Sequence, residues 1–395
     1  MPRYARSNPV FRYAGRVRRL LVGIAAIVAA TPTAGAAQRF WNAAYAPYAY
    51  YRSVDGFWLA GYALFYSPVG FREQPEPNRA WALLRAALST AGSYIVVADV
   101  QAPAWWNGWR VGVTLAARRD NRLGYFGVGN ETVFDGDSAT AIRPFFYKAS
   151  RSTQRARLTI QRRLVGPLRA LAGAGVERTD FRELPGESLF RRHLASGTID
   201  PGTVPFVDAV LRAGLVLDTR DHEIDPHRGV FAEALYSSGR AYARTTGGAR
   251  VWIRPAQRLW LAARAAGERM TGDPPLAALL TMETSEDPFA AVGGHRSLRG
   301  YQDARFTGPG KLLATLDARY AVVWKPTIFE LKIGGFYDVG RVFGPGEPFR
   351  VTTAGLHAGW GGEVGARVQR NTLFVVGAGF GDEGWQLMVD TKWAF

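Results

Sequence analysis

The chain has 395 residues, of which 49 are Lys or Arg and 33 are Asp or Glu, so its formal net charge is +16, and it has no cysteine. The lack of cysteine excludes a disulfide framework, thiolate metal ligands and a cysteine nucleophile. A basic balance often marks nucleic-acid binding, but the basic residues here are spread along alternating segments and not gathered on one helix, so we expect no nucleic-acid partner.

The N-terminus has the pattern of a secretory signal peptide. Six arginines precede an apolar run of about 11 residues, which is followed by small residues up to Ala36. The arginines are Arg3, Arg6, Arg12, Arg16, Arg18 and Arg19. A membrane anchor is the alternative, but a helix needs about 20 apolar residues to span a bilayer. We therefore expect a signal peptide over residues 1–36, a short periplasmic segment over 37–52, and a charge of about +10 on the mature chain.

The rest of the composition favours a membrane β-barrel. Beyond the N-terminal run no segment approaches the length of a transmembrane helix, so an exported chain of this kind is either soluble or a barrel. Hydrophobic residues make up 47% of the chain, with 12 Trp, 16 Tyr and 22 Phe, as interfacial aromatic girdles require, and 45 Gly suit tight turns. A closed barrel also leaves no strand edge exposed in a protein without disulfides.

Apolar and polar residues alternate cleanly in several segments. From Val207 to Asp218, the odd positions are all apolar, whereas the even positions include Asp208 and Arg212. Turn residues separate sixteen segments of about the length that a tilted membrane strand needs. They lie near 53–66, 79–90, 92–101, 109–118, 141–149, 153–164, 167–178, 207–218, 229–240, 247–255, 258–269, 311–324, 328–339, 357–369, 372–381 and 385–395. We predict an all-β chain in which residues 53–395 form a transmembrane antiparallel barrel of about 16 strands.

The longest connection runs from Met270 to Gly310, between the eleventh and twelfth expected strands. With a periplasmic N-terminus it is the sixth extracellular loop. If the polar face of strand 328–339 lines the lumen, the loop could fold inward and set the guanidinium of Arg299 against the Asp338 carboxylate. The residues expected to meet there are Arg299, Gly300, Tyr301, Phe336, Asp338, Gly340 and Glu363. Taken separately, the two motifs also suit an ordinary exposed turn and an ordinary strand end.

Together, these motifs resemble those of the BamA/TamA family, the bacterial surface antigen family. In that family an Arg-Gly-Tyr/Phe motif lies at the tip of the sixth extracellular loop, and a Phe-x-Asp-x-Gly motif two strands later receives it. The segment Tyr125–Asn130 is similar to a Tyr-x-Gly-x-Gly-Asn segment of shorter members. A further resemblance is to the periplasmic turn between strands eight and nine. Its matching residues are Asp218, Arg220, Asp221, Pro226, Arg228 and Gly229.

The last strand ends in a free aromatic carboxy-terminus. Its odd positions are apolar, and we expect them to form a lipid-facing row. These residues are Trp385, Leu387, Val389, Trp393 and Phe395. The row resembles the C-terminal sorting signal of bacterial outer-membrane barrels, although a soluble β-sandwich can end on a similar strand.

The resemblance implies a monomeric barrel in the outer membrane of a Gram-negative cell, in contact with lipid and lipopolysaccharide. It implies insertion or translocation of nascent outer-membrane proteins through a lateral seam between the first and last strands. Gly359 and Gly379 are expected to weaken packing near that seam. The chain looks like a short member that lacks POTRA domains, so a passive channel or a surface-exposed structural barrel stays open as the alternative.

Candidate catalytic and metal sites are weak. The sequence contains neither a Gly-x-Ser-x-Gly motif nor a Walker loop, so we expect no enzyme activity and no cofactor. His222 and His227 lie five residues apart in a charged turn and are expected to be solvated. The acidic residues around them lack the spacing of an EF-hand loop, and we therefore predict no metal.

Overall fold

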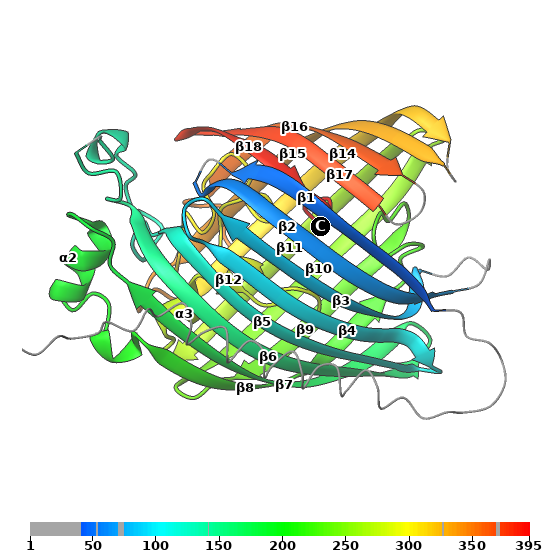
Figure 1. Cartoon of the computed structure of the whole chain (residues 1–395), viewed down its shortest axis with the longest axis horizontal. Helices are drawn as coiled ribbons and strands as arrows, with labels where there is room; N and C mark the ends of the chain where they lie inside the picture. Colours follow the sequence, from blue (N-terminus) through cyan, green and yellow to red (C-terminus); the bar gives the residue numbers. More distant parts are fainter. Residues whose placement is uncertain (1–40, 53, 70–74, 141, 326–327, 369–371) are drawn as a thin grey trace, which may run out of the picture. The chain divides into compact units, whose positions relative to one another are not determined.

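Sixteen strands follow one another as an antiparallel meander in the part of the chain that the computed structural model describes (Figure 1). That part comprises residues 41–52, 54–69, 75–140, 142–325, 328–368 and 372–395. It belongs to the unit Trp41–Phe395. The expected signal peptide, residues 1–36, lies outside the described residues.

The strands of the sheet are β1 (Asn42–Arg52), β2 (Gly56–Pro68), β3 (Asn78–Ser89), β4 (Tyr94–Trp106), β5 (Trp109–Gly124), β6 (Lys148–Val165), β7 (Leu168–Arg182), β8 (Phe206–Asp218), β9 (Gly229–Ser238), β10 (Tyr242–Ala256), β11 (Leu259–Gly272), β14 (Gly310–Lys325), β15 (Phe329–Phe343), β16 (His357–Val368), β17 (Thr372–Gly381) and β18 (Gly384–Asp390). Two short strands, β12 (Thr281–Met282) and β13 (Phe289–Ala290), pair with each other inside the β11–β14 connection. Short helices α2 (Leu189–Ala195) and α3 (Leu276–Leu279) and the 3-10 turns Gly136–Ser138 and Pro201–Thr203 lie in connections.

Burial is inverted relative to a soluble protein. In β8, Leu211 is 67% exposed, whereas its neighbour Arg212 is 6% exposed. Apolar side chains therefore cover the outer face, and charged side chains fill the interior, as in a barrel whose exterior contacts lipid. The alternation along the strands sets this arrangement, because successive side chains point to opposite faces of a sheet. The predicted fold class, a transmembrane antiparallel barrel of about 16 strands, is confirmed.

The connections divide into two sets. At one end, here called the loop end, lie the long connections β5–β6, β7–β8, β11–β14 and β15–β16. At the other, the turn end, most connections are short, and the β8–β9 turn is a longer exception. No helix among the described residues is long and apolar enough to cross a membrane.

The first strand was predicted in the wrong place. Residues 42–52, expected as part of a periplasmic segment outside the barrel, form β1 and pair with β2 from Asn42 opposite Tyr66 to Arg52 opposite Gly56. Alternating Ala and Tyr give little contrast between the two faces, and Pro47 argues against a strand interior. An edge strand tolerates proline because it pairs on one side only.

The strand predicted over residues 141–149 does not form. Residues 142–147 lie in bends and turns, and only Lys148 and Ala149 belong to β6. Phe146 and Tyr147 pack with Phe126 instead of lining the wall. This additional predicted strand offsets the missed β1. From β6 onward, each strand of the sheet therefore has the same position in the order as predicted, with β14 as the twelfth strand.

Candidate functional site

Arg299 lies inside the barrel against strands β14, β15 and β16 and is completely buried. It belongs to the β11–β14 connection, residues 273–309, here called the plug loop. Its Nε and Nη2 donate to the two oxygens of Asp338 on β15, each at 2.8 Å, and its backbone N–H donates to the same carboxylate at 2.9 Å. This bidentate contact is the strongest geometry available to a guanidinium and a carboxylate.

Two further carboxylates complete the surroundings of Arg299. Nη2 also donates to Asp317 of β14 at 2.7 Å, and Nη1 lies 3.2 Å from Glu363 of β16. Phe336 lies two residues before Asp338 on the inner face of β15. The Arg299 guanidinium stacks on its ring, 3.6 Å from the ring centroid. Burial disfavours the cation, but Asp317, Asp338 and Glu363 more than offset this effect and raise the pKa of Arg299 above its usual range. Arg299 therefore stays charged.

The tip of the plug loop lies directly on the backbone of the wall. Gly300 has φ +97°, and a Cβ there would be 2.5 Å from the Phe380 carbonyl oxygen. On the wall, a Cβ on Gly359 would be 1.9 Å from the Arg299 carbonyl oxygen, and one on Gly379 would be 2.5 Å from the Gly300 nitrogen. Gly359 and Gly379 therefore make room for the loop tip. The sequence alone indicated that they weaken packing near the seam and did not predict this contact.

Replacing Gly359 with alanine is expected to displace the tip, because its nearest neighbour is a backbone atom that cannot rotate away. We expect a loss of roughly 1–3 kcal/mol in unfolding free energy and faster proteolysis within the plug loop. Gly362→Ala, on the outer face of the same strand, is the matched control, since its new methyl would meet nothing closer than 3.4 Å. Equal unfolding midpoints for the two variants would show that the glycine contact is not needed.

Other residues of the loop tip hold the neighbouring wall. The Tyr301 ring packs over Gly381, and its hydroxyl donates to Asp382 at 3.2 Å. Gly340 leaves room for Val292 of the plug loop, whose side chain would lie 2.8 Å from an added Cβ. His295 lies 3.7 Å from both Glu363 and Asp390, and its Nε2 is 3.2 Å from the Lys392 carbonyl oxygen. The tip therefore contacts β15, β16, β17 and β18.

Asn130 connects the loop end to the same wall. It accepts a hydrogen bond from the Val342 N–H at 3.0 Å and donates to the Gly355 carbonyl oxygen at 2.9 Å. Tyr125 packs in a cluster with Phe190 of α2. The segment 125–130 is thus packed among the connections at the loop end of the barrel.

The β8–β9 turn folds into the barrel at the turn end. Asp218 accepts two hydrogen bonds from the Arg220 guanidinium, at 2.9 Å each, and one from its backbone N–H at 3.2 Å. Asp221 accepts from the His227 and Arg228 N–H groups. Gly229 has φ +119°, and a Cβ there would lie 2.4 Å from the Thr219 carbonyl oxygen. Pro226 is buried and the Arg228 side chain is exposed.

Asp225 is the buried centre of this turn, and its importance was not predicted. It accepts from Lys332 at 2.6 Å and from the Trp393 indole at 2.8 Å, and Arg367 lies 3.3 Å away. His227 and Glu330 complete a group of potential metal ligands with Asp225. Lys332 lies 3.2 Å from Glu330 as well, so ammonium and guanidinium groups already neutralise these carboxylates.

The C-terminal residues separate into two groups. Trp385, Leu387 and Val389 lie on the outer face and are each at least 61% exposed. The prediction that Trp393 and Phe395 continue this row is wrong, because β18 ends at Asp390 and the last five residues turn inward.

Both inward aromatic residues have partners inside the barrel. Trp393 is 3% exposed and stacks under Arg319 at 4.1 Å. Phe395 lies 4.8 Å from the Arg264 guanidinium and packs against Trp252 of β10. Alternation between faces applies only while the strand continues, so it cannot describe this tail.

Comparison with known proteins finds the fold but not a family. No family model matches the chain. No curated protein matches it either. Among solved structures, BamA from Haemophilus ducreyi lacking POTRA domains 1-3 is 13% identical with a TM-score of 0.54, over 90% of this chain and 69% of that one. CdiB from Escherichia coli is 11% identical with a TM-score of 0.55, over 91% of this chain and 62% of that one.

The shared feature is the architecture of a transmembrane β-barrel. At these identities the likeness establishes the fold alone, and the chain spans about two thirds of the length of the two solved chains. In its fold, the protein is thus a barrel similar to BamA and CdiB.

Proposed function

We propose that this protein lies in the outer membrane of a bacterial cell, with lipid around its apolar exterior, and assists the insertion or translocation of other outer-membrane proteins. The observation that carries the proposal is the plug loop, whose Arg299 is fully buried among three carboxylates. A lumen filled in this way is poorly suited to passive diffusion. The likeness in fold to BamA and CdiB supports the same proposal.

Client strands would enter at the seam between β1 and β18, which are the first and last strands of the sheet. β18 has seven residues and β1 has 11, so the last strand can pair with only part of the first. Pro47 lacks an N–H group, which further reduces the donors of β1. An incoming strand could satisfy the remaining backbone groups by β-augmentation.

A disulfide across the seam tests this function. Cysteine is absent from the sequence, so pairs can be introduced without interference. Suitable pairs combine Ala44→Cys or Ala46→Cys with Gln386→Cys or Met388→Cys. Under oxidising conditions the locked barrel should fail to rescue a deletion strain and its outer-membrane proteome, and reductant should restore rescue, because augmentation needs free backbone edges.

The matched control is a disulfide between two strands that are already fully paired. Ala60 of β2 and Ala87 of β3 lie opposite each other and serve this purpose. Full rescue by every oxidised seam variant would contradict the proposal. Steady single-channel conductance in planar bilayers, together with such rescue, would favour the passive channel.

A further inference from the structure

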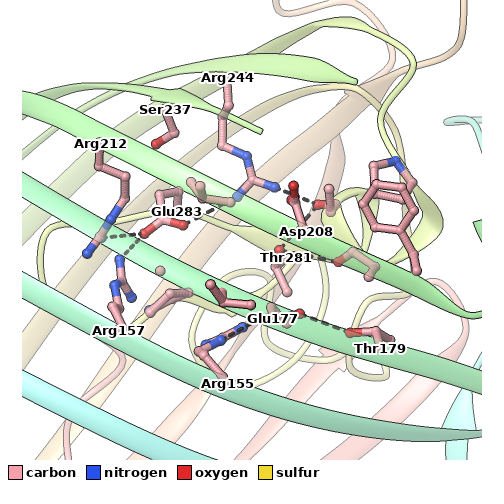
Figure 2. Close-up of a pocket in the computed structure, with 18 of the residues that line it drawn as sticks. Arg155, Arg157, Glu177, Thr179, Asp208, Arg212, Ser237, Arg244, Thr281 and Glu283 are labelled. Carbon is pink, nitrogen blue, oxygen red and sulfur yellow. Dashed lines mark hydrogen bonds and ion pairs between the residues drawn. The ribbon is translucent and has the colours of Figure 1, made fainter. Parts of the chain in front are cut away.

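The acidic part of the plug loop, residues 281–287, lies against a group of arginines from other elements than those around Asp338, and Figure 2 shows those around Glu283. Glu283 forms ion pairs with Arg157 of β6, with Arg212 of β8 at 3.0 Å and with Arg244 of β10 at 3.7 Å. Glu286 pairs with Arg250 at 2.7 Å and Arg220 at 3.0 Å. We call these five arginines the arginine wall. Its members are Arg157, Arg212, Arg220, Arg244 and Arg250.

Three members of the arginine wall depend on the loop for their neutralisation, whereas Arg220 also pairs with Asp218 and Arg244 with Glu268. All five side chains are between 3% and 12% exposed. Within the described residues, Arg157, Arg212 and Arg250 form ion pairs only with the loop's two glutamates. Leaving a buried charge unpaired is strongly unfavourable. If the loop leaves, these three arginines lose their carboxylate partners, which favours the binding of another anionic group.

Two glutamates beside the arginine wall bind the peptide backbone of the loop, and such contacts distinguish a polypeptide from a phosphate group. Glu268 accepts the Glu283 N–H at 2.8 Å, and Glu233 accepts the Ser285 N–H at 2.8 Å. A phosphate offers no N–H donors to these carboxylates.

A cavity of about 80 Å³ borders Glu283 and gives room for further contacts. Arg155, Arg212 and Arg244 are among its lining residues, as Figure 2 shows. In the described part of the chain, the Ser237 hydroxyl, also in this lining, has no hydrogen-bond partner. Arg244 likewise keeps an unused donor at Nε. The site therefore has polar capacity beyond what the loop uses.

We propose that the arginine wall is a binding site for acidic segments of client polypeptides, and that residues 281–287 occupy it as an internal competitor. This inference rests on the proposed function, since a client chain would be the occupant. Guanidinium groups recognise carboxylates bidentately, and the wall carboxylates Glu233 and Glu268 select for a peptide backbone.

Binding of a labelled peptide to the purified full-length barrel in detergent tests the proposal. The probe has the sequence of residues 281–288, Thr-Met-Glu-Thr-Ser-Glu-Asp-Pro. The E283Q/E286Q variant should bind it at least tenfold more tightly than the wild type, by fluorescence anisotropy, because its own loop no longer competes. A probe with glutamine at both glutamate positions is the matched control and should not bind.

Three results would overturn the proposal. They are no binding of the acidic probe to E283Q/E286Q, equal binding of the glutamine probe, or displacement of the probe by inorganic phosphate at matched ionic strength. If E283Q/E286Q does not fold, E286Q alone replaces it, since the Glu286 side chain is 36% exposed. Adding Arg212→Met to the tested variant should abolish binding.

The outcome can be separated from that of the seam experiment. Peptide binding needs no membrane activity, so it can be measured in the seam-locked protein as well. If the locked barrel binds the probe and still rescues the deletion strain, the seam mechanism fails and the peptide site stands. Loss of rescue on locking, together with no binding of the probe to E283Q/E286Q, would retain the seam mechanism and overturn the peptide site.

Discussion

Arg299→Ala is expected to release the plug loop and to lower the unfolding free energy by roughly 3–5 kcal/mol. The substitution removes the only cation that contacts Asp338, and it also leaves Asp317 and Glu363 with one partner fewer, among the described residues. Uncompensated buried carboxylates are the source of the cost. Denaturant unfolding in detergent measures the stability, and limited proteolysis within residues 273–309 reports the release.

Arg296→Ala is the matched control for this experiment. Arg296 lies three residues before Arg299 in the same loop, and its guanidinium is partly exposed over the Phe289 ring at 5.4 Å. Its loss should cost no more than about 1 kcal/mol. If both variants unfold at the same denaturant concentration and resist protease equally, Arg299 does not fasten the loop.

The second large effect is expected for Asp225→Asn. Lys332, Arg367 and the Trp393 indole all converge on this carboxylate, so removing its charge should cost roughly 3–5 kcal/mol and free the C-terminal tail. Carboxypeptidase should then release Phe395 faster than from the wild type. Asp221→Asn is the control, because the Asp221 side chain is 42% exposed. Equal release from both variants would contradict the prediction.

Acid should remove the difference between Asp225→Asn and the wild type. Burial disfavours the carboxylate, but Lys332 and His227 more than offset this and hold the pKa of Asp225 well below its usual range. The Asp225 carboxylate therefore stabilises the folded protein fully above about pH 4, the pKa of an aspartate in the unfolded chain. This stabilisation is lost as the pH falls through the lower pKa of Asp225 in the folded protein. Unfolding midpoints measured from pH 7 downwards should separate above about pH 4 and converge below it.

Alternation of apolar and polar residues predicted most strands of the barrel. Motif spacing predicted one contact inside it, between Arg299 and Asp338. The charged even positions of β8 and β15 identified their inner faces, and Arg299 and Asp338 were the two charges that the loop could bring together. Glu363 was found by the same reasoning on β16. The sequence thus contained both members of the pair, each in a recognisable local pattern.

Partners across the lumen were harder to predict. Asp225 and Lys332 are 107 positions apart. Period-2 alternation says that Lys332 points inward but not which carboxylate meets it, because closure of the sheet decides that. β1 was missed for a local reason, since its apolar residues show no contrast between faces. The tail after Asp390 was misassigned because a strand pattern was extended past the last ladder pair.

His295 gives the plug loop a mechanical consequence for the rest of the barrel. Its ring reaches both the final residue of β18 and the carbonyl oxygen of Lys392, whereas the neighbouring Arg299 is anchored on β14, β15 and β16. The loop thus links β14, β15 and β16 to β18, which is the shortest of the sixteen strands. Lifting the loop tip would therefore also break the His295 contacts to Asp390 and Lys392, so the last strand would lose a support in the same step.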